Sequence, residues 1–126
     1  MSFESTLESW IVGALTGHDL AQVQGFAFNL MEPGNGGFGI ELIGAPAFSE
    51  DDPDWPCDEI FEASPRSIPI PDDTHGGDWQ SCLASTKSAL KSIIDSGSEA
   101  AGLLRQAKGI GVGFVDGDLE TLYVAS

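Results

Sequence analysis

Two pairs of segments in which apolar residues alternate with small or polar ones constrain the fold of this chain most strongly. The first pair spans residues 25–32 and 37–44, and a cluster of Pro, Gly and Asn typical of turns separates its members. The second pair spans residues 110–115 and 119–124 around Asp116-Gly117, a dipeptide that favours the two-residue turn of a β-hairpin. Because a period of two is the period of a β-strand, each pair predicts an antiparallel hairpin.

Three further segments have the 3.6-residue period of an amphipathic helix. Residues 3–15 place apolar side chains on one face, and residues 79–96 carry the clearest apolar stripe of the chain, which begins at Trp79. A shorter helix is predicted over residues 98–106. The pattern predicts a single globular domain over residues 1–126, of the α+β class. We expect a mainly antiparallel β-sheet built from two hairpins, packed with an N-terminal helix and with one long and one short helix in the second half.

The connection between the first hairpin and the long helix is rich in proline. Residues 45–56 contain three prolines, so we expect no regular structure there, and residues 57–63 predict a short strand. Prolines keep residues 64–78 extended, since a proline and the residue before it both avoid the helix. We therefore expect long irregular connections, which often carry the function of a compact domain.

The second hairpin has an unusual first strand. Gly111 and Gly113 leave one face of this strand without side chains. Glycine inside a strand often marks a place where another segment approaches the backbone closely. We therefore expect a helix or another stretch of backbone to pack against this face.

Seven carboxylates crowd into thirteen residues of the long connection. This acidic segment, residues 50–62, holds Glu50, Asp51, Asp52, Asp54, Asp58, Glu59 and Glu62. A solvated loop that raises solubility would explain the charge alone, but Trp55, Cys57, Ile60 and Phe61 are interleaved with it, and plain acidic tails lack such residues. We interpret the segment as an acidic surface that binds a partner and is held in shape by apolar residues. Trp55 fits either an interface anchor or a plug on the sheet, and we favour the plug because buried aromatic side chains dominate core energetics.

The charge of the chain is strongly negative and unevenly distributed. Twenty Asp and Glu against five Lys and Arg give a formal net charge of −15. Residues 1–65 contain twelve Asp or Glu and no Lys or Arg, so we expect no salt bridges within this half and a preference for cationic partners. Direct binding of nucleic acid is disfavoured because phosphate contacts need Lys and Arg.

The N-terminus lacks a signal-peptide pattern, and no apolar run reaches the roughly 20 residues of a membrane helix. We therefore expect a cytoplasmic protein without membrane contact.

No residue pattern in the sequence indicates a reaction centre. Nucleophilic catalysis would need Cys57 or Cys82 together with His18 or His75. Carboxylates around Cys57 disfavour its thiolate, and Cys82 falls on the apolar stripe of the long helix. We therefore expect two reduced cysteines that contribute to packing, and no enzymatic activity.

A metal site is a further candidate. Asp72, Asp73, His75 and Asp78 could supply oxygen and imidazole ligands, but their spacing matches neither a calcium-binding loop nor a zinc motif. The first two of these aspartates also suit a turn, and Asp78 suits a helix N-cap. We expect no metal and no other cofactor.

Two stretches taken together resemble a known class of proteins. DPDWPCDEIF at residues 52–61 and GIGVGFVDGDLETLYV at residues 109–124, with the tryptophan-led helix between them, resemble small bacterial immunity proteins of polymorphic toxin and contact-dependent inhibition systems. The resemblance extends over residues 25–124. It implies neutralisation of a cognate toxin domain by direct binding, and a basic toxin, often a nuclease, would complement the acidic surface. Two other interpretations stay open: an acidic nucleic-acid mimic that inhibits a DNA- or RNA-binding protein, and a small Cys/His hydrolase.

Overall fold

The computed structural model describes residues 3–32, 37–52, 55–71, 78–114 and 119–125. Its elements are α1 (Phe3–Leu15), β1 (Gly25–Met31), β2 (Phe38–Ala45), the short 3-10 helix η1 (Trp55–Cys57), β3 (Phe61–Ile70), α3 (Trp79–Asp95), α4 (Glu99–Leu104), β4 (Gly109–Phe114) and β5 (Glu120–Val124). The strands form one five-stranded sheet in the order β3-β2-β1-β4-β5. The prediction of an α+β fold with a mostly antiparallel sheet is confirmed.

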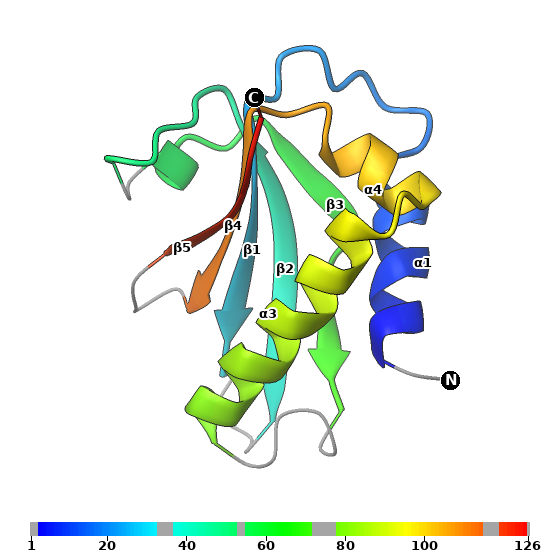
Figure 1. Cartoon of the computed structure of the whole chain (residues 1–126), viewed down its shortest axis with the longest axis vertical. Coiled ribbons are helices and arrows are strands. Elements are labelled where there is room, and N and C mark those ends of the chain that lie inside the picture. Colours follow the sequence, from blue (N-terminus) through cyan, green and yellow to red (C-terminus); the bar gives the residue numbers. More distant parts are fainter. Residues whose placement is uncertain (1–2, 33–36, 53–54, 72–77, 115–118, 126) are drawn as a thin grey trace.

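The helices α1, α3 and α4 all cover one face of this sheet, which we call the helical face (Figure 1). Alternate side chains of the central strands point to this face, and they include Phe26 and Phe28 of β1 and Leu42 of β2. They pack against apolar side chains of the helices, such as Leu7 of α1 and Leu90 of α3, and all of these residues are buried. The main core therefore lies between the sheet and the three helices.

Local sequence signals set the start and the end of the predicted long helix, α3. Asp78 caps α3, since its Oδ1 accepts a hydrogen bond from the backbone N–H of Ser81 at 2.8 Å. Gly97 follows α3 with a φ of 72°, a left-handed conformation that glycine adopts without steric cost. The boundaries of α1 agree with the prediction of residues 3–15, and α3 stops one residue short of the predicted 96.

Both predicted hairpins are present. β1 and β2 pair antiparallel along their whole length, from Gly25 opposite Ala45 to Met31 opposite Gly39. β4 and β5 also pair antiparallel, with a bulge in the register beside Gly111. The predicted turn at Asp116-Gly117 lies outside the described residues. The two hairpins join through a parallel pairing of β1 with β4, which places both of their first strands in the middle of the sheet.

The prediction for the proline-rich connection was wrong in one respect. Residues 61–70 form the ten-residue strand β3, whereas only residues 57–63 were expected to form a strand and residues 64–78 an irregular connection. β3 pairs antiparallel with β2 and lies at the edge of the sheet. Proline cannot donate a ladder hydrogen bond but is tolerated in an edge strand, whose outer side needs no partner. An irregularity in the register between Glu41 and Ile43 accommodates the extra residues of β3.

The opposite face of the sheet, which we call the outer face, has a small apolar cluster of its own. Its buried members are Ala27, Ile43, Ala45 and Trp55, with Phe48 and Leu119 packed against them. Glycines let these side chains approach the strands. A Cβ built on Gly25 would lie 2.5 Å from the Trp55 ring, and one built on Gly111 would lie 3.1 Å from Leu119. The expected close approach at Gly111 is thus made by a side chain and not by a helix or backbone.

Among the described residues, none of the helices has both the length and the apolar character needed to cross a membrane.

Candidate binding surface

The acidic segment lies over the outer face of the sheet, between the end of β2 and the start of β3 (Figure 1). Trp55 holds it there: its side chain is only 5% exposed and packs in the outer-face cluster. Phe48 supports Trp55 in a T-shaped contact, with ring centroids 5.2 Å apart. The burial of Trp55 agrees with the interpretation of this residue as a plug. Trp55 therefore attaches the segment to the sheet at this residue.

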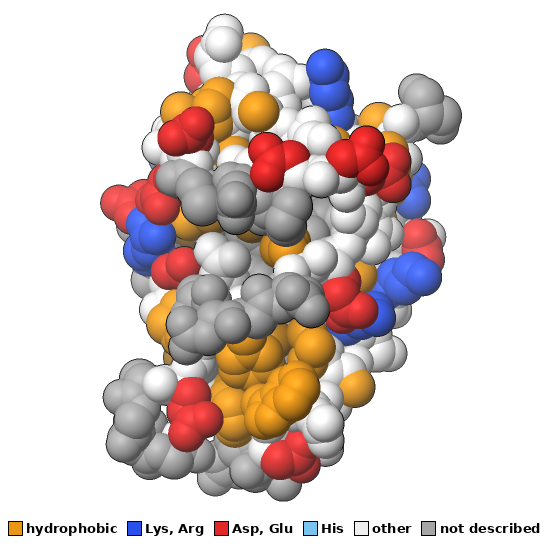
Figure 2. All heavy atoms as spheres, turned by 90° about the vertical axis from the view of Figure 1, so that its left-hand side faces the viewer, with side chains coloured by type: hydrophobic (Ala, Val, Ile, Leu, Met, Phe, Trp, Pro, Cys, Tyr) orange, Lys and Arg blue, Asp and Glu red, His pale blue; other side chains and the backbone are white. Residues whose placement is uncertain are grey.

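The seven carboxylates of the acidic segment fall into two groups. Glu50, Asp51, Asp52 and Asp58 are exposed, and Asp54 lies outside the described residues. Glu59 and Glu62, at the end of the segment, are also exposed, but they contact Arg66 of β3. Figure 2 shows carboxylates spread over this side of the molecule, with several in its upper half. We take the first group as the part of the predicted binding surface that contacts a partner.

Arg66 is the centre of an ion cluster that sequence reasoning missed. Its Nε donates to Oε2 of Glu41 on β2 at 2.9 Å, and its Nη2 donates to Oε1 of Glu59 at 2.9 Å. Its Nη1 also contacts Glu59 and Glu62. These hydrogen bonds raise the pKa of Arg66, and the hydrogen bond from Arg66 is the main reason that the pKa of Glu59 is lowered.

The ion cluster supplies carboxylates of residues 1–65 with a cation from the second half of the chain. No cation lies within residues 1–65, but the pairing of β3 with β2 brings Arg66 opposite this region. Three carboxylates surround one guanidinium, so the cluster stays negative while it ties the end of the acidic segment to the sheet. Trp55 fixes the middle of the segment and Arg66 fixes its end.

Ile60 is exposed within this charged surface, although sequence analysis counted it among the residues that hold the segment in shape. Its side chain is 51% exposed, while its backbone N–H donates to the carbonyl of Gly44 at 2.8 Å. An open depression of about 510 Å³ lies beside it, lined by His18, Val23, Phe61 and other residues. An apolar side chain held by its backbone beside a depression is suited to contact a partner.

Among the cysteine and histidine candidates, the structure describes the side chains of Cys82 and His18. Cys82 is buried in the main core, and burial raises the pKa of its thiol to about 11. A thiol with such a pKa is almost wholly protonated at neutral pH and is a poor nucleophile. His18 packs its ring against Phe61 with centroids 5.4 Å apart. His75 and the side chain of Cys57 lie outside the described residues.

The metal candidate receives no support from the described part of the chain. Asp78 is the N-cap of α3, and Asp72, Asp73 and His75 lie outside the described residues. Within residues 3–32, 37–52, 55–71, 78–114 and 119–125, no three His, Cys, Asp or Glu side chains are grouped so as to hold a metal ion.

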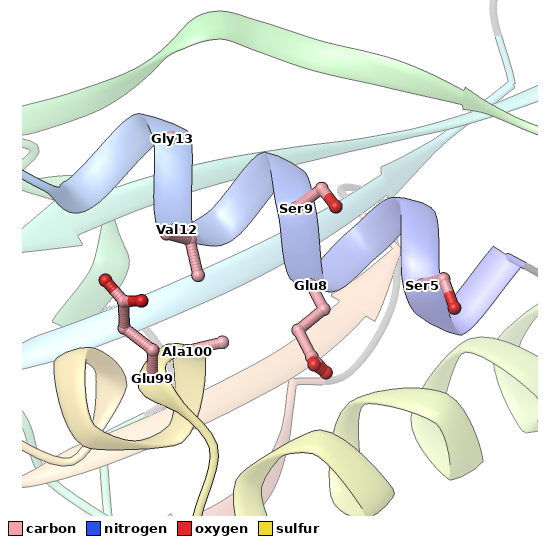
Figure 3. Close-up of a pocket in the computed structure, with 7 residues that line it drawn as sticks. All are labelled: Ser5, Glu8, Ser9, Val12, Gly13, Glu99 and Ala100. Carbon is pink, nitrogen blue, oxygen red and sulfur yellow. The ribbon is translucent and has the colours of Figure 1, made fainter.

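A second depression lies on the other side of the molecule, between α1 and α4. It has a volume of about 620 Å³, and its lining includes Ser5, Ser9, Val12 and two carboxylates, Glu8 and Glu99. The two carboxylates come from different helices and flank the opening (Figure 3). We assign this depression no chemistry.

No family model matches this chain, and no curated protein and no solved structure matches it either. The function must therefore be argued from the surface itself.

Proposed function

We propose that this protein binds and neutralises a basic protein, in the manner of the immunity proteins that protect bacteria from toxin domains. The proposal rests on one observation, the exposure of carboxylates and of an apolar side chain on the same acidic segment. There Glu50, Asp51 and Asp58 are exposed on the same segment as Ile60, whose side chain is also exposed. Carboxylates with an apolar residue among them are the complement of a cationic protein surface.

The way in which the acidic segment is fixed supports a binding role. Ordering a flexible loop on binding costs free energy, and a segment that is already ordered avoids this cost. Trp55 and Arg66 attach the described part of the segment to the sheet at two points, through the outer-face cluster and the ion cluster. A segment that served only solubility would need neither contact.

The charge of the whole molecule supports the same partner class. With a net charge of −15, the protein attracts cationic proteins over about a Debye length, roughly 8 Å at physiological salt. Such attraction raises association rates more than it slows dissociation. A toxin must be captured before it acts, so a rapid association rate suits an inhibitor.

The test is a comparison of two triple variants that change the net charge equally. The first is Glu50→Gln/Asp51→Asn/Asp58→Asn on the acidic segment. The second, Glu4→Gln/Glu8→Gln/Glu99→Gln, lies on α1 and α4, which are on the other side of the molecule (Figure 1). The binding partner is a basic toxin domain, sought in the neighbouring gene, and the measurement is surface plasmon resonance at low and at high salt.

We expect the first variant to slow association at low salt and to weaken protection of cells that express the toxin domain. The second variant should retain nearly the rate of the unmodified protein, apart from a small general effect of its net charge. Equal association rates for the first variant and the unmodified protein would contradict the proposal.

A further inference from the structure

A second exposed apolar group lies at the other end of the same side of the molecule. Trp79, the first residue of α3, is 55% exposed, although sequence analysis placed it on the inward stripe of the helix. Its ring meets the ring of Phe114, the last residue of β4, at right angles with centroids 6.2 Å apart. Phe114 in turn meets Phe38 of β2 at 5.9 Å, and Phe38 is buried in the main core. A row of three aromatic rings therefore leads from the core to the surface.

The surroundings of Trp79 carry negative charge. Asp78 precedes it, and the exposed Glu32 follows β1, whose end lies beside Phe114 through the pairing of Leu30 with that residue. Figure 2 shows hydrophobic side chains gathered in the lower half of this side, towards the first turn of α3, with carboxylates next to them. An exposed aromatic ring with carboxylates near it is a favourable place for a guanidinium or ammonium group.

We propose that Trp79 and Phe114 form an aromatic anchor for the same basic partner, and that arginine side chains of that partner stack on the Trp79 ring. This inference rests on the proposed function, because the partner is the same protein. The acidic segment and the aromatic anchor lie at the two ends of one side of the molecule, so one partner surface can contact both. Tryptophan is among the residues most enriched at the energetic centre of protein interfaces.

A second copy of this chain is the other occupant to consider. Two copies would each bring a net charge of −15, and the carboxylates near Trp79 would face one another. Like charges held close together oppose association. Charge complementarity therefore favours a cationic partner over a dimer.

The experiment uses a capped hexa-arginine peptide at low ionic strength and follows the indole N–H signals of the protein by NMR. The chain has three tryptophans, and Trp10 and Trp55 are buried, so only the Trp79 indole is exposed to a stacking arginine. Peptide affinity is measured by fluorescence anisotropy for the unmodified protein, for Trp79→Ala and for Trp79→Leu. Val124→Ala, which truncates an exposed apolar side chain of β5 outside the proposed binding surface, is the matched control.

We expect the peptide to shift the Trp79 indole signal and to leave those of Trp10 and Trp55 in place. Both Trp79 variants should bind the peptide about 2–5-fold more weakly, the size of an exposed cation–π contact. The Leu variant keeps an apolar contact with Phe114, so a loss in both variants identifies the aromatic face as the cause. Val124→Ala should bind with nearly unchanged affinity.

Four results would overturn the inference. Three concern the peptide: no binding at low salt, an unmoved Trp79 signal, or unchanged affinity in both Trp79 variants. The fourth is a concentration-dependent dimer of the protein that Trp79→Ala abolishes. The proposed function is tested separately. If the acidic-segment variant binds the toxin domain like the unmodified protein while the Trp79 variants lose affinity, the acidic surface is wrong and the aromatic anchor stands. The reverse pattern would remove the anchor alone.

Discussion

Replacing Trp55 by Ala should destabilise the protein severely, because this side chain is the largest member of the outer-face cluster. A tryptophan buries roughly 150–250 Å² of surface, and at about 25 cal/mol per Å² this corresponds to roughly 4–6 kcal/mol. The denatured chain already buries part of this surface, so the free energy gained on folding is smaller. Alanine also retains part of the contact. We expect a loss of about 3–4 kcal/mol in the free energy of unfolding, within the range known for buried Trp→Ala changes.

Urea denaturation followed by far-UV circular dichroism measures this loss, and the thermal midpoint should fall by about 10–15 °C for a domain of this size. Trp79→Ala is the control. It makes the same chemical change at a side chain that is 55% exposed, where Trp55 is 5% exposed, so it should cost less than about 1 kcal/mol. A loss below about 1 kcal/mol in Trp55→Ala would refute the view that Trp55 is a plug.

A double-mutant cycle with Gly25 locates the effect. A Cβ at Gly25 would lie 2.5 Å from Cζ3 and 2.9 Å from Cη2 of Trp55, so Gly25→Ala must displace the ring. We expect that substitution to cost about 1–3 kcal/mol in the unmodified protein. In the Trp55→Ala background the obstacle is absent and the cost should be close to zero, which gives a coupling energy of about 1–3 kcal/mol. Equal costs in both backgrounds would show that Trp55 does not rest on this glycine.

The remaining predictions concern the ion cluster and the buried thiol. Because Arg66 lowers the pKa of Glu59, the cluster contributes stability above the ordinary carboxylate pKa of 4.5 and loses it as pH falls through the lowered pKa. Arg66→Gln should therefore lower the free energy of unfolding at pH 7 by roughly 1 kcal/mol, a modest value because the partners are partly exposed. It should also flatten the decline of stability below pH 4.5, which urea denaturation at several pH values measures. A pH profile equal to that of the unmodified protein would contradict this. In a Cys57→Ser background, Cys82 should resist alkylation at pH 8 in the folded protein, because burial raises the pKa of its thiol to about 11. It should react when urea unfolds the protein. Intact mass measures the modification, and full modification of the folded protein would show that the thiol is accessible.

The helices and hairpins could be predicted because each depends on the local sequence. The apolar period of residues 3–15, the cap at Asp78 and the glycine after α3 are all local signals. The parallel pairing of β1 with β4 has no such signal, since it joins strands that are far apart in the chain. β3 was missed for the opposite reason. Its prolines are strong local signals against a central strand, and only its edge position in the sheet makes them acceptable.

The binding surface was predictable in its charge but not in its shape. Sequence placed the carboxylates on one segment but did not show that Arg66, which follows that segment, lies across from Glu41 and Glu59. Trp79 was expected on the apolar stripe of its helix, and Ile60 was expected to help hold the acidic segment in shape, but both side chains are exposed. Trp79 is the first residue of its helix and packs on Phe114 at the end of β4, so half of its ring remains outside. The apolar period of α3 gives no information on where β4 ends, so it could not predict how much of the Trp79 ring is covered.

The exposed groups on this side of the molecule should govern different stages of binding. Glu50 and Asp51 are exposed carboxylates, and exposed charges act at a distance but contribute little once a salt bridge is formed in water. Trp79 and Ile60 act only on contact, where they can be desolvated by a partner. It follows that salt, or neutralisation of the carboxylates, should reduce mainly the association rate with the basic partner. Loss of the Trp79 side chain should raise mainly the dissociation rate, because its contact exists only in the complex. The two kinetic constants therefore report on the two parts of the surface independently.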